Sequence, residues 1–319
     1  MSTEENGLKA GSNLEKILKA GHFAFTGELG PPRGANAAEV IEKAQHLKGV
    51  VDAVNITDNQ TAMVRMSSWA ASLLLIKEGL EPNFQMVCRD RNRLAMQSDI
   101  LGAYAHGVRN MLCLSGDHQK FGDHPQAKGV FDIDSMQLIA MVKKMRDENK
   151  FLGGADLDEA PKLFIGAAAN PFADPFEWRV HRLAKKIAAG VDFNQTQCIY
   201  NMEKFREWIH QANDMGLTEK AYILAGVTPM KSVGMAKYMK NNVAGIDVPD
   251  DVIRRMEGVP KEKQREEGIK ICVETILKLK EMKGIRGVHV MAIEWEDAVG
   301  EIVEQAGLLP RPQVNDSEK

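Results

Sequence analysis

Short apolar runs rich in β-forming residues alternate along this chain with longer segments of helical periodicity. Runs such as VRNMLCLS and KLFIGAAA stay apolar at consecutive positions, as parallel strands with both faces buried do. Eight runs of this kind can be counted, and we predict one strand in each. They span residues 23–28, 51–57, 84–88, 108–115, 163–168, 193–197, 222–226 and 288–293.

The segments between these runs carry helix signals. Asn36 and Glu39 form an N-x-x-E capping pattern ahead of an apolar stripe. Apolar residues within 269–276 recur at i, i+3, i+4 and i+7, the pattern of a helix that lies on a sheet. The long stretch 119–161 exceeds a simple βα unit, and we predict in it a loop over the active face and a helix over about 134–146.

Eight βα units in roughly 300 residues fit one α/β domain, a (β/α)8 TIM barrel with extra terminal helices, better than an open sheet. We expect the barrel over residues 1–309 and a flexible C-terminal tail over residues 310–319. Active sites of such barrels form where the strands end and the following loops begin. The carboxyl ends of the eight runs are therefore the places to search for chemistry.

Composition narrows the range of partners. The chain has 41 Lys and Arg against 44 Asp and Glu, a formal net charge of −3, and 44% of its residues are hydrophobic. This balance argues against a nucleic-acid binder, a membrane-spanning protein and a disordered chain. The polar start of the chain lacks the features of a signal peptide, so we expect a cytoplasmic protein. The four cysteines form no CxxC pair, and we expect neither a metal site nor disulfides.

The first predicted strand ends in a carboxyl group. Glu28 precedes a Pro-Pro turn and has Phe23, Phe25 and Leu29 close by in the sequence. A carboxyl group among apolar side chains keeps its proton closer to neutral pH, so Glu28 is a candidate general acid. A Glu at a barrel rim that caps a helix or forms an ion pair explains the same pattern equally well.

Other strand ends supply further polar groups. Asp117 follows Gly116, whose backbone can approach a ligand closely, although an Asx-turn residue fits this position too. Gln85 and Gln197 carry amides that suit the edge of a heterocycle, or that are simply satisfied within the core. Because neither GxGxxG nor GxxxxGK[ST] occurs, a Rossmann or P-loop nucleotide site is not supported.

Five motifs together give a specific resemblance. They are TGELGPPR at 26–33, VNITDN at 54–59, LCLSGDH at 112–118, LAKKIAAGVDFNQTQ at 183–197 and LAGVTP at 224–229. In this order and at these strand ends, the chain resembles the methylenetetrahydrofolate reductases, flavin-dependent barrels of one-carbon metabolism. The resemblance extends over roughly residues 10 to 310 and implies a flavin, FAD or alternatively FMN, lying across the strand ends.

The resemblance also implies roles for individual residues. Glu28 would protonate N10 of methylenetetrahydrofolate and open its ring, after which reduced flavin N5 delivers a hydride to the methylene carbon. Asp117 matches the aspartate between flavin and pterin, Gln197 matches the amide that positions the folate, and Met239 stands where a substrate-binding side chain is found. Flavin contacts are implied for Thr57, Gln85, Ser115, Gly116, Asp117, Phe131 and Lys186.

Several departures from the family pattern bear on the electron donor. Ser115 replaces an arginine near the flavin, and Arg179 and Arg182 stand where related enzymes hold Asp and Asn for the adenine half of FAD. Met235 and Trp295 also replace residues that are typical of the family. Such changes resemble the reductase subunits of acetogen-like bacteria. The donor is then NAD(P)H or an iron–sulfur and zinc-containing partner subunit, and an oligomer is expected.

Two other functions fit the same residues. A flavin-free pterin barrel that transfers a methyl group from a folate to a corrinoid would also place acids and amides at a barrel mouth. A non-catalytic electron-transfer or scaffold subunit could keep the barrel without turnover. A bound flavin would distinguish a reductase from the flavin-free methyltransferase. The retained Glu28, Asp117 and Gln197 argue against a non-catalytic subunit.

Overall fold

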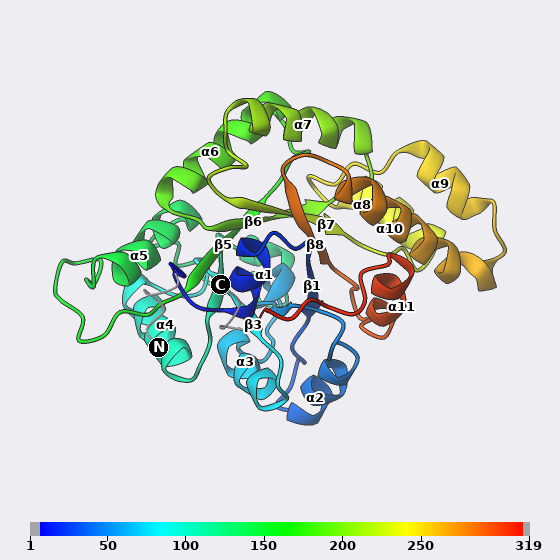
Figure 1. Ribbon diagram of the computed structural model, residues 1–319. Coiled ribbons are helices and arrows are strands. Elements are labelled where there is room, and N and C mark those ends of the chain that lie inside the picture. The colour runs from blue at the N-terminus through cyan, green and yellow to red at the C-terminus, as the bar shows by residue number, and fades with distance from the viewer. Residues whose placement is uncertain (1–6, 315–319) are drawn as a thin grey trace.

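A computed structural model describes residues 7–314, which form a closed barrel of eight parallel strands in sequential order (Figure 1). This architecture confirms the predicted (β/α)8 TIM barrel. The predicted tail residues 315–319 lie outside the described residues. The strands are β1 (Ala24–Leu29), β2 (Ala53–Ile56), β3 (Pro82–Val87), β4 (Asn110–Leu114), β5 (Phe164–Ala169), β6 (Phe193–Cys198), β7 (Tyr222–Val227) and β8 (Ile285–Val290).

The eighth strand lies three residues earlier than the sequence predicts. It spans Ile285–Val290, whereas the apolar run suggested 288–293. Gly287 lies just before that run, yet it pairs with Ala24 of β1, where an added Cβ would lie 2.4 Å from the Ala24 carbonyl oxygen. The glycine is therefore part of the barrel closure, and Glu294 and Trp295 lie in the loop beyond the strand instead of at its end.

Helices cover the outside of the barrel (Figure 1). The predicted N-cap Asn36 is confirmed, because its side chain accepts a hydrogen bond from the Ala38 amide. The helix predicted over about 134–146 begins with a capping box between Asp134 and Gln137. The helices are α1 (Asn13–Lys19), α2 (Ala37–Gln45), α3 (Ser68–Lys77), α4 (Arg93–Ala105), α5 (Ser135–Asp147), α6 (Arg179–Ala189), α7 (Met202–Asp214), α8 (Val233–Asn242), α9 (Asp250–Glu257), α10 (Gln264–Lys280) and α11 (Ala298–Gln305). Short 3-10 turns occur at 60–62, 119–121, 176–178 and 261–263.

The inside of the barrel changes character along its axis. At the amino-terminal end of the strands it is apolar, with Phe164 and Phe193 stacked at 5.1 Å. Gly166 makes room for this pair, since an added Cβ would lie 2.3 Å from the Phe193 ring. Toward the carboxyl ends the inward positions become polar, beginning with Thr26 and Asn55. The polar end is therefore the side that can hold a ligand.

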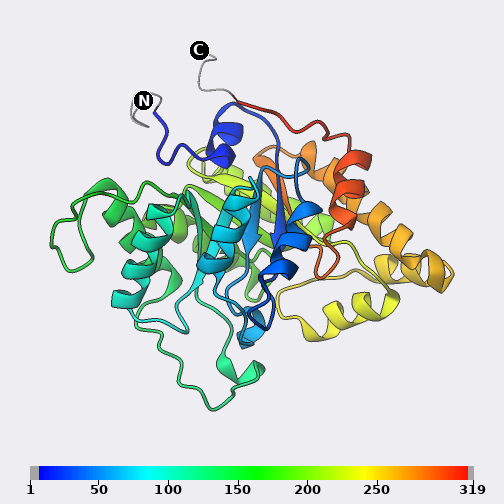
Figure 2. The same ribbon diagram turned by 90° about the horizontal axis from the view of Figure 1, so that it is seen from below.

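Helix α1 closes the apolar end of the barrel (Figure 1). Figure 2 shows α1 and the segment after α11 at the same end, with the loop after β4 reaching out from the other. Arg311 holds the carboxyl-terminal segment in place, because its guanidinium pairs with buried Asp52 at 2.6 Å and donates to the Phe23 carbonyl. The first residues of the predicted tail, 310–314, thus include a fixed contact with the barrel.

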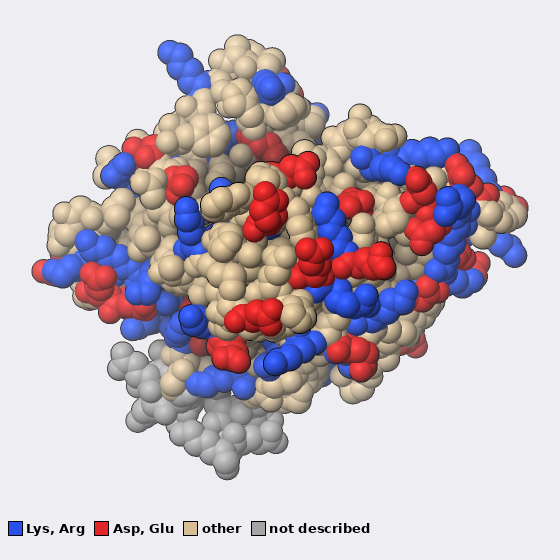
Figure 3. Space-filling view, turned by 90° about the horizontal axis from the view of Figure 1, so that it is seen from above, with Lys and Arg blue, Asp and Glu red and all other residues tan. Residues whose placement is uncertain are grey.

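Charge is mixed on the face of the molecule that Figure 3 shows. On the side that lies uppermost in Figure 1, basic and acidic side chains are interspersed (Figure 3). This mixture fits the nearly balanced composition and offers no broad basic field for a polyanion. Within residues 7–314, no helix has the length and apolar character needed to cross a bilayer.

Candidate functional site

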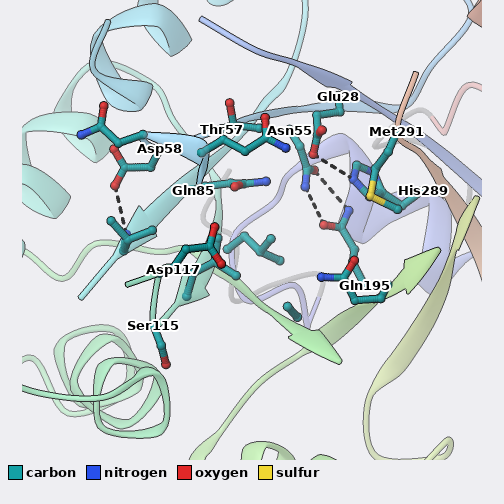
Figure 4. A pocket seen from close by; sticks show the side chains of 18 of the residues that line it. Glu28, Asn55, Thr57, Asp58, Gln85, Ser115, Asp117, Gln195, His289 and Met291 are labelled. Atoms are coloured by element: carbon teal, nitrogen blue, oxygen red, sulfur yellow. Dashed lines mark hydrogen bonds and ion pairs between the residues drawn. The ribbon is translucent and has the colours of Figure 1, made fainter. Parts of the chain in front are cut away.

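A cavity of about 310 Å³ opens at the carboxyl ends of the strands (Figure 4). Every strand except β7 contributes side chains to it. Among the residues singled out from the sequence, those that line this cavity are Glu28, Thr57, Gln85, Ser115, Gly116, Asp117 and Gln197. Residues separated by up to 169 positions in the chain therefore meet at one site, as the barrel topology requires.

Glu28 faces into the barrel, and its neighbours differ from those expected. Side chains alternate along a strand, so Phe25 and Leu29 point outward into the core shared with the helices. The carboxyl group instead lies beside His289 of β8, with 3.6 Å between Glu28 Oε2 and His289 Nε2. Its side chain is 12% exposed. The apolar setting inferred from the sequence is wrong, and a buried polar setting takes its place.

A hydrogen-bonded network lies directly beneath this pair. Asn83 donates to Asn55 at 2.7 Å, Asn55 donates to Gln195 at 2.6 Å, and Gln195 donates to Thr26 at 3.3 Å. The Thr26 hydroxyl lies 3.0 Å from His289 Nδ1. All of these side chains are buried. Figure 4 shows Asn55, Gln195, His289 and Glu28 gathered on one side of the cavity.

Asp117 lies on the other side of the cavity (Figure 4). Gly116 precedes it with a φ of +87°, and an added Cβ would lie 3.0 Å from Val87 Cβ. The guanidinium of Arg89 donates to the Asp117 carbonyl at 3.1 Å and to the Asn59 carbonyl at 3.1 Å. Arg89 is 3% exposed and pairs with Asp90, whose charge helps raise the pKa of the guanidinium. This arginine therefore fixes two loops of the site together.

The floor of the cavity holds an unpaired polar atom. Thr57 Oγ1 is buried and has no hydrogen-bond partner among the described residues. Asp58, the next residue, is fully engaged, because its carboxylate accepts from the Val87 amide at 3.0 Å and from Arg91 at 2.7 Å. A buried hydroxyl without a partner is costly unless a ligand or water satisfies it. Thr57 is thus ready to bind a polar group in the cavity.

A second cavity of about 250 Å³ adjoins the first along Ser115, Ala168 and Gln197. Its wall carries Arg179, Arg182 and Lys186 on one stripe of α6. Burial, together with the charge of Arg182, lowers the pKa of Lys186 to about 8. Lys186 donates to the Ala168 carbonyl and Arg179 to the Asp174 carbonyl, and no ion pair of the three cations occurs among the described residues. Their charges are therefore available to an anion.

Two residues implied by the resemblance do not reach the cavities. Phe131 is 42% exposed in the loop after β4 and lines neither of them. Met239 is 4% exposed in a core cluster with Met230 and Met256, where the Tyr200 hydroxyl lies 3.5 Å from its sulfur. In this structure Met239 is a core residue, because its side of α8 packs inward.

Sequence reasoning missed His289, Arg89 and Asn55 as site residues. These side chains lie one or more residues before or after the strand ends where polar groups were expected. The missed signal is the alternation of inward positions, since Thr26 and Glu28 are two residues apart and His289 pairs in register with Thr26. A polar residue inside an otherwise apolar strand marks an inward-facing position.

Comparisons with known proteins place the chain in a family. The sequence model of the family described as methylenetetrahydrofolate reductase matches residues 13–307. A Caenorhabditis elegans protein named probable methylenetetrahydrofolate reductase (NADPH) is 22% identical over 92% of this chain. Methylenetetrahydrofolate reductase 2 of Schizosaccharomyces pombe is 24% identical over 80% of it. The matched parts amount to 44% and 40% of those relatives, so the chain spans less than half of their length.

A solved structure shares the fold. A Clostridium thermocellum protein, described as binding two copies of 5-methyl-5,6,7,8-tetrahydrofolic acid, aligns with a TM-score of 0.62 and 14% identity. The alignment covers 92% of this chain and 99% of that one. At this level of identity the likeness establishes the barrel architecture.

Proposed function

Since the chain belongs to the methylenetetrahydrofolate reductase family, we propose that it reduces 5,10-methylenetetrahydrofolate to 5-methyltetrahydrofolate with a bound flavin. One observation carries the proposal. Glu28, Asp117 and Gln197 line a single cavity although they come from three different strand ends. This reaction needs three groups from the protein, namely a general acid, a second carboxylate and an amide. The folate bound by the Clostridium thermocellum structure is consistent with such a pocket.

The two adjoining cavities fit a flavin nucleotide. The larger one contains the unpaired Thr57 hydroxyl and Gln85, which can hydrogen-bond a ring system. The smaller one offers three cations to a phosphate, a match of charge that arginine makes especially well. Gly116 keeps the backbone between them free of a side chain. When bound, the flavin would supply the hydride that the protein itself cannot.

The protein's own groups handle the proton and the orientation of the substrate. We assign to Glu28 the proton that N10 of the folate receives when the five-membered ring opens. Gln197 and Asp117 would hold the pterin by hydrogen bonds, since both line the cavity.

We further propose that a partner subunit with an iron–sulfur cluster supplies the electrons. All four cysteines of this chain are buried and apart from the cavity lining, so a cluster that serves this site would belong to another chain. The resemblance to acetogen-like reductase subunits motivates this choice over direct use of NAD(P)H.

The experiment that tests the function uses the purified full chain. We expect a yellow protein whose flavin, once reduced with dithionite, is reoxidised by methylenetetrahydrofolate with formation of 5-methyltetrahydrofolate. NADH or NADPH alone should reduce the flavin slowly or not at all, whereas rapid reduction would contradict the partner proposal. A colourless protein that transfers methyl groups from a folate would favour the methyltransferase alternative instead.

The cationic cavity predicts a pH-dependent flavin affinity. Lys186 loses its charge as the pH rises through about 8, so flavin binding should weaken between pH 7 and pH 9.5. Lys186→Met should raise the flavin Kd about 10- to 100-fold at pH 7 and remove that pH dependence, because a charge-assisted hydrogen bond contributes about 1.5–3 kcal/mol. Flavin fluorescence titration measures the Kd.

The matched control is Lys185→Met, an exposed neighbour on the same helix. It should leave both the affinity and its pH dependence unchanged. If Lys186→Met bound flavin as the parent protein does, the second cavity would not be the phosphate site.

A further inference from the structure

We propose that Glu28 and His289 form a couple that holds one proton between them, and that Thr26 orients the imidazole for this task. The inference rests on the proposed function, because the proton is the one that the folate nitrogen receives. It starts from the 3.6 Å separation of Glu28 Oε2 and His289 Nε2 inside the barrel. Figure 4 shows the two side chains facing one another across the seam between β1 and β8.

The barrel register explains why these groups meet. Thr26 and His289 are paired residues of β1 and β8, and Glu28 follows two residues after Thr26 on the same inward face. Each position is therefore fixed by strand pairing and not by a loop. Thr26 and His289 are 0% and 3% exposed, so neither side chain can turn toward solvent without opening the barrel.

The hydrogen bonds around Thr26 determine which imidazole nitrogen carries hydrogen. A threonine hydroxyl donates one hydrogen bond and accepts two. Thr26 donates to the Val288 carbonyl at 3.3 Å and accepts from the Gln195 amide at 3.3 Å. In the proposed couple, His289 donates its Nδ1–H to the Thr26 hydroxyl over the remaining contact of 3.0 Å, and its Nε2 presents a lone pair to the Glu28 carboxyl.

A chain of amides sets how Gln195 meets Thr26. The orientation of Gln195 is fixed because its carbonyl oxygen accepts from Asn55 Nδ2 at 2.6 Å. Asn55 is fixed in turn, since Asn83 donates to its carbonyl oxygen at 2.7 Å. The Gln195 amide nitrogen therefore faces Thr26, and Thr26 accepts from it. A network of this kind orders a site beyond what its single bonds contribute.

The proton balance is simple. In the proposed resting couple, one proton is shared between Glu28 Oε2 and His289 Nε2, which lie 3.6 Å apart. When Glu28 gives its proton to the folate nitrogen, an N–H bond forms and the carboxyl O–H bond breaks. The couple is left with one proton fewer and a carboxylate. A proton from solvent then restores it through His289 Nε2, because the imidazole also lines the cavity.

Other charged groups surround the couple at greater distance. Within residues 7–314, His289 is the ion-pair partner of Glu28. Burial raises the pKa of the nearby Cys198 thiol to about 11, so that thiol stays protonated. The remaining charged groups that line a cavity with Glu28 are Lys43, Asp58, Arg65, Arg89, Asp117, Glu294 and Glu296. They set the field on the couple, but none of them shares its proton.

The test is the pH profile of a single turnover. Protein with chemically reduced flavin is mixed with methylenetetrahydrofolate between pH 5 and pH 9, and flavin reoxidation is followed. His289→Gln should lower the rate about 30- to 100-fold at pH 8 and bring it within about threefold of the parent rate at pH 5.5, because a lone carboxyl keeps its proton only in acid. Thr26→Val should also lower the rate more at pH 8 than at pH 5.5. Thr26→Ser, which keeps the hydroxyl, should restore the pH profile of the parent protein.

Two controls separate this proposal from a structural effect and from the proposed function. His210→Gln makes the same substitution on the exposed outer face of α7 and should leave the profile unchanged. If the parent protein does not respond to methylenetetrahydrofolate at all, the proposed function fails.

A second measurement then still tests the couple. Nitrogen-15 NMR of labelled histidine, assigned by the signal that His289→Gln removes, should show neutral His289 protonated at Nδ1. An Nε2–H tautomer, or a His289→Gln profile parallel to the parent profile, would overturn the proposal.

Discussion

Replacing Glu28 with glutamine is expected to abolish the reduction of methylenetetrahydrofolate while leaving the flavin bound and reducible. The amide keeps the size and position of the side chain beside His289 but cannot donate the proton that opens the folate ring. General acid catalysis contributes about 10²- to 10⁴-fold, and here the ring does not open without it. We expect the rate of flavin reoxidation by the folate to fall at least about 10³-fold.

Two further measurements show whether the effect of Glu28→Gln is confined to folate reduction. The visible spectrum of Glu28→Gln and its titration with dithionite should match those of the parent protein, since Glu28 lies apart from the cationic cavity. Loss of flavin binding together with folate reduction would mean that Glu28 has a structural role. If Glu28→Gln kept both flavin binding and folate reduction, Glu28 would not be the general acid.

The barrel itself could be predicted because its signal is redundant. Eight apolar runs and the helices between them repeat the same information, so a three-residue error in β8 does not change the topology. Strand ends were predicted well for the same reason. The ends carry Glu28, Thr57 and Asp117, and the closed barrel brings them to one cavity whatever their separation in the sequence.

The environment of each site residue could not be predicted in this way. Phe25 and Leu29 adjoin Glu28 in the sequence but face the helices, whereas His289, 261 positions away, is its neighbour across the β1–β8 seam. Neighbours within a barrel are set by strand pairing, which the apolar pattern does not contain. Met239 illustrates the same limit, because a motif gives a position along α8 and not the direction of its side chain.

Asp192, at the start of β6, has the second large predicted effect, this time on stability. Its carboxylate accepts from the Arg146 guanidinium at 2.5 Å and from the Ile165 amide at 2.8 Å, and Lys9 pairs with its other oxygen. The side chains of Asp192 and Arg146 are both 2% exposed. Asp192→Asn would remove the buried counter-charge of Arg146 and leave it with Asp147, whose side chain is 39% exposed. Removing one partner of a buried pair costs about 3–5 kcal/mol.

Thermal unfolding can check this expectation. For a chain of this size, such a loss should lower the Tm of Asp192→Asn by about 5–8 °C. Asp156→Asn is the matched control, because Asp156 also pairs with a lysine but its side chain is 81% exposed, and an exposed pair contributes about 0–1 kcal/mol. Equal Tm values for the two variants would mean that the charge of Arg146 is satisfied elsewhere. A specific loss in Asp192→Asn would show that the closed end of the barrel stabilises β6, the strand that carries Gln195 and Gln197 to the site.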